Sequence, residues 1–193
     1  MNSLDKTLTL WLNFDGGAVM DRIMWIASGK LTWLPLYLLL IYVLWRRFGW
    51  KYMLIVLATA IVGVVVSDQI CNYFKHTFQM MRPTHDGTIS DLVHTVVSPH
   101  NRLPYVGGLY GTVSAHAATV TTIAAVIGHA IKNRWYKIII PVWVLTVCYS
   151  RIYLGVHFLS QIIFGIVLGL LTAFLLNRLL VRYFDRYKLP TEA

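Results

Sequence analysis

The sequence predicts an all-α integral membrane protein, a helical bundle with about five transmembrane helices preceded by N-terminal interfacial helices. Two observations lead to this prediction. The 193-residue chain is 57% hydrophobic and only 13% charged, with a mean hydropathy of +0.61, whereas about a quarter of the residues in a soluble domain are charged. The apolar residues also gather in long runs, as membrane spans require.

Five apolar runs are candidates for full spans, because about 20 helical residues cross the hydrocarbon core. They are Leu31–Trp45, Tyr52–Tyr73, Val113–Ile131, Ile138–Tyr153 and Phe158–Leu180. The first run is short, so we expect it to extend back past Lys30, whose ammonium would reach the interface.

Two segments before these runs, Leu4–Phe14 and Ala18–Ser28, mix apolar and charged residues. They carry Trp11 and Trp25, which fit the aromatic belt of a membrane interface. We expect helices lying in the interface, separated by a turn at residues 15–17. A sixth span is the alternative.

Basic residues cap the apolar runs, in clusters at 46–51, 132–137 and 178–188. This is the positive-inside pattern, and it places the three clusters in the cytoplasm. It also explains the net charge of +9 without a nucleic-acid partner. Residues 82–112 and 151–157 would then share the extracytoplasmic face.

No linker or change of composition divides the chain. We therefore expect residues 1–193 to form one membrane-embedded domain. Within it, residues 1–29 would be interfacial helices, 31–180 the helical core and 181–193 a basic tail.

Charged residues in membrane helices are costly, and by default they indicate function. The second span carries Asp68 and continues through Lys75 toward Arg82 and Pro83. The first three would share a helix face at i, i+7 and i+14, and Pro83 would end the helix. Snorkelling to the membrane interface would explain the position of Lys75 or of Arg82 alone. It does not explain why both would share a helix face with Asp68.

The third span begins with the sequence GTVSAH at 111–116. A helix N-terminus presents unpaired N–H groups and favours an anion. Ser114 and His116 would lie in this first turn. The alternatives are an ordinary helix cap for Ser114 and an interfacial position for His116.

The fourth span ends at Arg151, and His157 and Gln161 follow with i, i+4 spacing. On one helix they would be neighbours, and an acceptor that fixes the imidazole tautomer suits a nucleophile or base. A polar pair that satisfies itself within the bundle is the alternative. Together the three segments place permanent cations, a helix N-terminus and two histidines at one membrane face, which is the composition of a phosphate site.

The three segments resemble the motifs of the type 2 phosphatidic acid phosphatase (PAP2) family of integral membrane lipid phosphate phosphatases. KHTFQMMRP at 75–83 resembles K-x6-R-P, VSAH at 113–116 resembles P-S-G-H, and SRIYLGVHFLSQ at 150–161 resembles S-R-x5-H-x3-D. Their order, their spacings and the span count agree over about Leu31–Leu180.

The resemblance implies hydrolysis of a phosphomonoester or diphosphate of an amphiphilic lipid. His157 would attack phosphorus and form a phosphohistidine, and His116 would protonate the leaving oxygen. The phosphoryl oxygens would be bound by Lys75, Arg82, Ser114 and Arg151. No metal or other cofactor is implied, because the cations supply the electrostatics that Mg²⁺ gives other phosphoryl-transfer enzymes. His85, His94 and His100 have spacings that fit no single helix face, so we expect no metal site from them.

Gln161 stands where the family has aspartate. An amide oxygen can orient the histidine but cannot stabilise its positive charge. Asp68, Asp86 or Asp91 could supply that charge from another element.

The leading hypothesis is a lipid phosphate phosphatase of a bacterial inner (cell) membrane, with its active site on the extracytoplasmic face. The alternative is a catalytically weak or inactive relative that binds a phospholipid or polyprenyl phosphate. A transporter is disfavoured, because the polar residues gather at one face and not at the midplane. The sequence leaves the lipid and the oligomeric state open.

Overall fold

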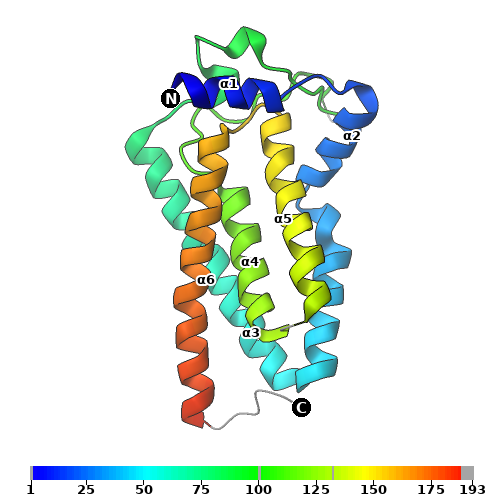
Figure 1. The fold of residues 1–193 in the computed structure, drawn as a ribbon, viewed down its shortest axis with the longest axis vertical. Helices are drawn as coiled ribbons and strands as arrows, with labels where there is room; N and C mark the ends of the chain where they lie inside the picture. Colours follow the sequence, from blue (N-terminus) through cyan, green and yellow to red (C-terminus); the bar gives the residue numbers. More distant parts are fainter. Residues whose placement is uncertain (1, 100, 132, 188–193) are drawn as a thin grey trace.

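The computed structural model describes residues 2–99, 101–131 and 133–187, and over these residues it is helical without a named strand (Figure 1). The long helices are α3 (Leu34–Phe78), α4 (Ala115–Ile131), α5 (Arg134–Tyr153) and α6 (Leu159–Tyr187). Two shorter helices, α1 (Ser3–Leu12) and α2 (Gly17–Ser28), precede them. Three 3₁₀ turns complete the elements: η1 (Leu31–Trp33), η2 (Pro83–His85) and η3 (Ser90–Leu92). The all-α prediction is confirmed for the described residues. The predicted basic tail lies outside them from residue 188 onward.

α3 consists of two helical arms that meet at Gly49 (φ 79°, ψ 168°). Only glycine adopts this backbone conformation without strain. The first arm descends through the molecule, and the second returns toward the end from which it came (Figure 1). The arms correspond to the predicted spans Leu31–Trp45 and Tyr52–Tyr73.

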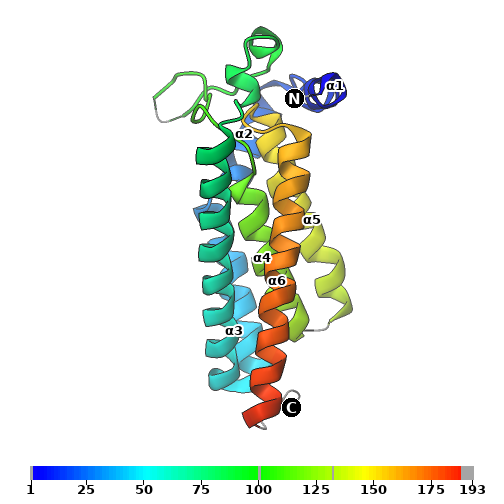
Figure 2. The same cartoon turned by 90° about the vertical axis from the view of Figure 1, so that its left-hand side faces the viewer.

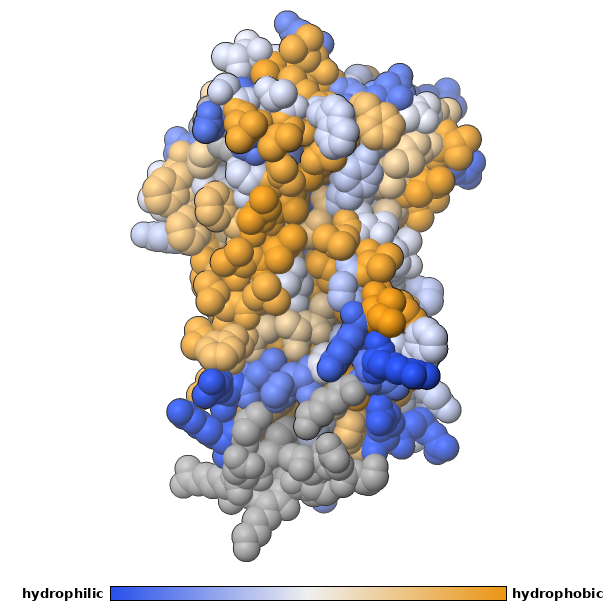
Figure 3. Space-filling view, in the orientation of Figure 1, coloured by the Kyte–Doolittle hydropathy of each residue, from blue (hydrophilic) through white to orange (hydrophobic). Residues whose placement is uncertain are grey.

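Among the described residues, two segments are long and apolar enough to cross a membrane, Leu31–Phe78 and Leu159–Leu180, and Ala115–Ile131 is a shorter apolar helix. The first of these contains both arms of α3. Figure 3 shows an apolar band across the middle of one face, with hydrophilic residues gathered toward the end where α3 turns. The predicted number of five spans stays a prediction.

α4 is the centre of the bundle and packs against α3, α5 and α6. Two glycines of α6 allow its backbone to approach α4. A Cβ atom at Gly165 would lie 2.6 Å from the Ser114 carbonyl oxygen, and one at Gly169 would lie 2.5 Å from the Ala118 carbonyl oxygen. The Gly-x3-Gly pattern of α6 therefore packs inside the bundle. It also fixes the beginning of α4 against α6, where the second and third sequence motifs lie.

α1 lies across the end of the bundle, and Figure 2 shows it nearly end-on. Side chains of α1 cap the beginning of α6. The Asp5 carboxylate accepts hydrogen bonds from the Ser160 N–H (3.0 Å) and hydroxyl (2.7 Å), and the Thr9 hydroxyl accepts one from the Leu159 N–H (3.0 Å). A carboxylate at a helix N-terminus satisfies unpaired N–H groups and interacts favourably with the helix dipole. The two predicted N-terminal helices are thus present, and their place in a membrane interface stays a prediction.

Asn13, which follows α1, caps the other end of the connection between α5 and α6. Its side-chain amide donates to the carbonyl oxygens of Ile152 (3.1 Å), Tyr153 (2.6 Å) and His94 (3.1 Å). Its own oxygen accepts from the His94 N–H (2.7 Å), and only 3% of the residue is exposed. The N-terminal segment therefore fixes both ends of the loop that carries His157.

We expect Asn13→Ala to destabilise the protein by about 2–4 kcal/mol, because it removes the side-chain partner of the Tyr153 and His94 carbonyl groups and of the His94 N–H. For a chain of this size the thermal unfolding midpoint in detergent should fall by about 5–10 °C. Asn101→Ala is the control, since Asn101 is exposed and its oxygen accepts a local bond from the Leu103 N–H. Equal midpoints for the two variants would contradict the role assigned to Asn13.

Candidate active site

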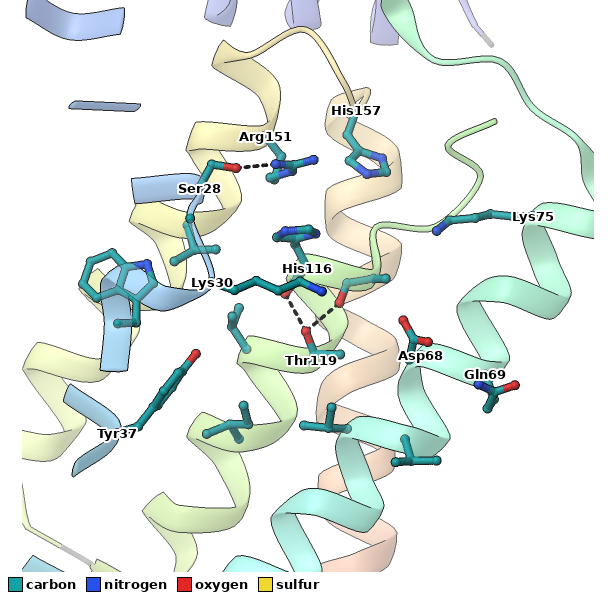
Figure 4. Close-up of a pocket in the computed structure, with 18 of the residues that line it drawn as sticks. Ser28, Lys30, Tyr37, Asp68, Gln69, Lys75, His116, Thr119, Arg151 and His157 are labelled. Carbon is teal, nitrogen blue, oxygen red and sulfur yellow. Dashed lines mark hydrogen bonds between the residues drawn. The ribbon is translucent and has the colours of Figure 1, made fainter. Parts of the chain in front are cut away.

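A cavity of about 670 Å³ opens among α3, α4, α5, the segment after α2 and the loop before α6 (Figure 4). Five of the seven predicted site residues line it: Lys75, Arg82, His116, Arg151 and His157. They come from all three sequence motifs, so the structure brings those motifs to one space. Ser114 and Gln161 are not among the lining residues.

The predicted helix face shared by Asp68, Lys75 and Arg82 is wrong for Arg82. α3 ends at Phe78, because Gln79 adopts a left-handed conformation (φ 46°) and caps the helix. Arg82 therefore lies beyond the helix in extended backbone (φ −77°, ψ 160°). Pro83 does not end α3 but begins η2.

Arg82 reaches the cavity by another route. Its Nε donates to the Tyr110 carbonyl oxygen (3.2 Å) and its Nη1 to the Val156 carbonyl oxygen (3.0 Å). Because Val156 precedes His157, these bonds hold the guanidinium next to the histidine. Gly107 passes close by, where a Cβ atom would lie 3.2 Å from Arg82 Nη1.

Ser114 is placed as the cap of α4. The helix begins at Ala115, and the Ser114 hydroxyl accepts from the Ala117 N–H (3.4 Å). The side chain is fully buried. The structure thus has the ordinary capping arrangement that the sequence left open, and a direct phosphate contact from Ser114 stays a prediction. His116, one residue into the helix, lines the cavity.

His157 contacts Gln161, although not across a helix face as predicted. α6 begins at Leu159, so His157 lies in the preceding loop. His157 Nδ1 is 2.9 Å from Gln161 Oε1 and 3.1 Å from the Gly111 carbonyl oxygen. The Phe158 N–H also donates to Gln161 Oε1 (3.3 Å), as the third residue of a capping box does.

These contacts determine the tautomer of His157. A carbonyl oxygen only accepts, and Gln161 Oε1 is held as an acceptor by Phe158, so Nδ1 must carry the proton. Nε2 is left with its lone pair. His157 and Gln161 are 2% and 1% exposed, so this arrangement is held within a packed environment. It is the arrangement that a histidine nucleophile needs.

Among the described residues, none of the carboxylates considered as substitutes for the missing aspartate forms a hydrogen bond or ion pair with His157. Asp86 forms an ion pair with Lys6 (2.8 Å), Asp68 accepts from Asn72 (3.0 Å), and Asp91 is 3.5 Å from the Ser90 hydroxyl. Although burial opposes it, hydrogen bonds from Lys6 and Thr88 hold the pKa of Asp86 at about 2. The second acceptor for His157 is instead the Gly111 carbonyl, which sequence reasoning missed.

The cavity is strongly cationic. Within the described ranges, no carboxylate forms an ion pair within 4.0 Å of Lys75, Arg82 or Arg151. The Arg151 guanidinium donates to the Ser28 hydroxyl, a contact that sequence reasoning also missed. Burial and then the neighbouring Arg82 and Arg151 hold the pKa of His157 well below its usual range. The imidazole is therefore neutral at physiological pH, as a nucleophile requires.

We expect Arg82→Gln to move the acidic limb of the pH profile of kcat/KM to higher pH. The positive charge of Arg82 lowers the pKa of His157, so removing it should raise that pKa, and a protonated imidazole could not act as the predicted nucleophile. The measurement is the pH dependence of kcat/KM, which reports the free enzyme. Arg102→Gln, in the exposed outer loop, should leave the limb in place. An unmoved limb in Arg82→Gln would contradict the assignment of the limb to His157.

Lys30 lines the cavity, and the expected place of its ammonium at the membrane interface stays a prediction. Figure 4 shows its side chain extending below His116 into the open space. Asp68 and Tyr37 also line this part. No spacing in the sequence indicates Lys30, because its position depends on where the segment between α2 and η1 packs.

The outer-loop histidines are only partly described, since His100 lies outside the described residues. His85 contacts the Thr84 hydroxyl (3.2 Å). His94, with Asp15 and Asp21, forms a group whose ligand atoms lie within 4.8 Å of one another and could hold a metal ion. His94 Nε2 is hydrogen-bonded to Asp21 Oδ1 (2.9 Å), so two of the potential ligand atoms are already bonded to each other.

Comparisons with known proteins agree on one family. The profile described as the PAP2 superfamily matches residues 48–185. A lipid A 4'-phosphatase of Bacteroides thetaiotaomicron is 30% identical over 171 residues, covering 88% of this chain and 73% of that protein. A lipid A 4'-phosphatase of Porphyromonas gingivalis is 31% identical over 169 residues, covering 87% and 69%.

Two crystal structures share the fold at 20% sequence identity. One is a transmembrane PAP2-type phosphatidylglycerolphosphate phosphatase from Bacillus subtilis, with a TM-score of 0.67 and coverage of 93% of this chain and 86% of that one. The other is LpxE of Aquifex aeolicus, with a TM-score of 0.69 and coverage of 92% and 96%.

Proposed function

This chain belongs to the PAP2 superfamily, and we propose that it is a membrane phosphatase that hydrolyses a phosphomonoester or diphosphate of an amphiphilic lipid through a phosphohistidine. One observation carries the proposal: three cations and two histidines from separate motifs line one cavity, and His157 presents a free Nε2 there. A cation-rich cavity with a neutral imidazole suits phosphoryl transfer to nitrogen.

In the first step His157 Nε2 attacks phosphorus, and the bond from phosphorus to the lipid oxygen breaks. His116 gives its proton to that oxygen, which leaves as an alcohol or, from a diphosphate, as a phosphate. Lys75, Arg82 and Arg151 bind the equatorial oxygens, where negative charge lies. In the second step His116 takes a proton from water, the water oxygen attacks phosphorus, and His157 leaves.

The relatives indicate a leading substrate. Both curated relatives are named lipid A 4'-phosphatases, so we propose that the phosphate of a lipid A-like molecule is a substrate. The basic residues Arg46, Arg47 and Lys51 lie at the turn of α3, at the opposite end from the cavity (Figure 1). By the positive-inside pattern the cavity would face the extracytoplasmic side of a bacterial inner membrane.

A second candidate is a weak or inactive relative that binds a lipid phosphate without turning it over. Gln161 favours this candidate, because it gives His157 an oriented hydrogen bond without a negative charge.

The test is phosphate release by the purified protein in detergent. The panel is lipid A, phosphatidylglycerol phosphate, phosphatidic acid and a polyprenyl diphosphate, each with and without EDTA. We expect release from at least one lipid, unchanged by EDTA. Binding of these lipids without release would favour the second candidate, and loss with EDTA that Mg²⁺ restores would contradict the histidine mechanism.

A further inference from the structure

We propose that the cavity contains a second polar region that binds the hydroxyl groups of a sugar or polyol headgroup. This region, the headgroup site, consists of Lys30, Tyr37 and Asp68. The inference rests on the proposed function, since it concerns the part of the lipid that carries the phosphate. It assigns substrate selection to residues outside the three sequence motifs.

The size of the cavity is the first argument. At about 670 Å³ it lies within the range of cavities that hold whole small molecules, far more than one phosphoryl group needs. The motif residues account for one side of the lining. The headgroup site lies on the remaining side, below His116 in Figure 4.

The second argument is the arrangement of the three side chains. Lys30 and Tyr37 come from the segment before η1 and the first arm of α3, whereas Asp68 comes from the second arm. Figure 4 shows Lys30 extending from one side of the cavity toward the side that holds Asp68. In the described part of the chain, neither Lys30 nor Asp68 forms an ion pair within 4.0 Å, so a gap separates the ammonium donor from the carboxylate acceptor.

The third argument is that these groups retain hydrogen-bonding capacity. Asn72 donates to Asp68 Oδ2 (3.0 Å), which orients the carboxylate, and Oδ1 has no donor among the described residues. The Lys30 ammonium and the Tyr37 hydroxyl form no hydrogen bond with the described part of the chain. The cavity therefore presents a charged donor, a charged acceptor and a phenol to one ligand.

Hydroxyl groups match this combination, because each can donate to the carboxylate and accept from the ammonium. A second phosphate would be attracted by Lys30 and repelled by Asp68. A hydrocarbon chain would leave both charges desolvated and unpaired, which is costly. The headgroup site thus favours a phosphate borne on a sugar or polyol over a diphosphate or a phosphate attached directly to a hydrocarbon tail.

The test compares three lipids: a monophosphorylated acyl glucosamine, a polyprenyl monophosphate and a polyprenyl diphosphate. The measured quantity is the ratio of kcat/KM for the sugar phosphate to kcat/KM for each polyprenyl lipid. A hydrogen bond to a charged group corresponds to about a 10- to 100-fold change. We expect Asp68→Ala to lower both ratios about 10- to 100-fold. We expect Lys30→Met to lower the ratio of the sugar phosphate to the polyprenyl monophosphate.

Asp91→Asn is the control, because Asp91 lies in the outer loop and does not line the cavity. It should leave both ratios unchanged. Thermal unfolding midpoints in detergent show whether Asp68→Ala folds, and Asp68→Asn gives a second, isosteric variant. Unchanged ratios in both Asp68 variants would overturn the headgroup site.

A binding measurement separates this inference from the proposed function. Dissociation constants for the same lipids are measured by microscale thermophoresis in a His157→Ala background, where no turnover is needed. Weaker binding of the sugar phosphate alone on adding Asp68→Ala would support the headgroup site even if the wild-type protein releases no phosphate. Equal weakening for all three lipids would overturn it.

Discussion

Replacing His157 with alanine is expected to lower phosphate release by about 10⁴-fold or more, the scale on which loss of a covalent nucleophile acts in other enzymes. In the proposed mechanism the imidazole Nε2 is the atom that bonds to phosphorus, and the lysine and arginines around it cannot take that role. Release from the best lipid is measured under single-turnover conditions. His76→Ala is the matched control, because His76 is an exposed residue of α3 that does not line the cavity.

The same variant tests the covalent intermediate. With ³²P-labelled lipid and an alkaline quench, the wild-type protein should retain label on histidine, and His157→Ala should retain none. Label that persists in His157→Ala, or release within tenfold of wild type, would show that another group attacks phosphorus.

His116→Ala is expected to cost less, about 10² to 10⁴-fold, because it removes proton transfer but keeps the nucleophile. The loss should depend on the leaving group. An aryl phosphate lipid, whose leaving oxygen needs no proton, should recover most of the labelling of His157 in this variant. An equal loss of labelling for alkyl and aryl esters would contradict the role of His116 as the acid.

The sequence motifs placed five cavity-lining residues correctly as neighbours, although two of the reasons were wrong. Arg82 does not share a helix face with Lys75, because Gln79 ends α3 before it. His157 does not share a helix with Gln161, because α6 begins after it. In both cases the side chain lies in a loop and is held at the cavity by a hydrogen bond to a distant carbonyl group, that of Val156 for Arg82 and that of Gly111 for His157.

Other parts of the site could not be predicted from residue types. The Gly111 carbonyl that holds His157 is a backbone group, which every residue has. Asn13 caps carbonyl groups about 140 positions away in the chain, and no local pattern indicates such a contact. Lys30 enters the cavity only because α2 packs beside α5. These contacts depend on how the helices pack, which local spacing does not contain.

Gln161 is the residue at which the third motif departs from its family, and the structure separates its two roles. Its oxygen accepts from His157 Nδ1 (2.9 Å) and from the Phe158 N–H (3.3 Å), so it orients the imidazole as an aspartate would. It supplies no negative charge, so the proposed phosphohistidine and a positively charged imidazole would be stabilised less than beside an aspartate. Its Nε2 is buried and has no hydrogen-bond partner among the described residues.

We therefore expect Gln161→Asp to raise turnover, from a few-fold up to about 10³-fold, given the effect of the corresponding amide-to-acid difference in serine proteases. Gln161→Glu is the matched variant, because it adds the charge while keeping the reach of glutamine to both donors. It also replaces the unpartnered Nε2 with an oxygen. If the gain depends on how closely the carboxylate approaches His157 Nδ1, turnover in Gln161→Glu will be higher than in Gln161→Asp.

The rates of the three proteins are compared on the best lipid at matched pH, together with the acid limb of kcat/KM. A carboxylate beside His157 raises its pKa, so the limb should move to higher pH in whichever variant gains activity. If the acid limb moves but the rate does not rise, the carboxylate changes the pKa of His157, but stabilising the positive imidazole does not limit turnover. An unmoved limb and lower rates in both variants would mean that the cavity around Gln161 is packed for the neutral amide, with the Gly111 carbonyl as the principal acceptor. Lipid binding without turnover in all three proteins would favour the binding function over the phosphatase.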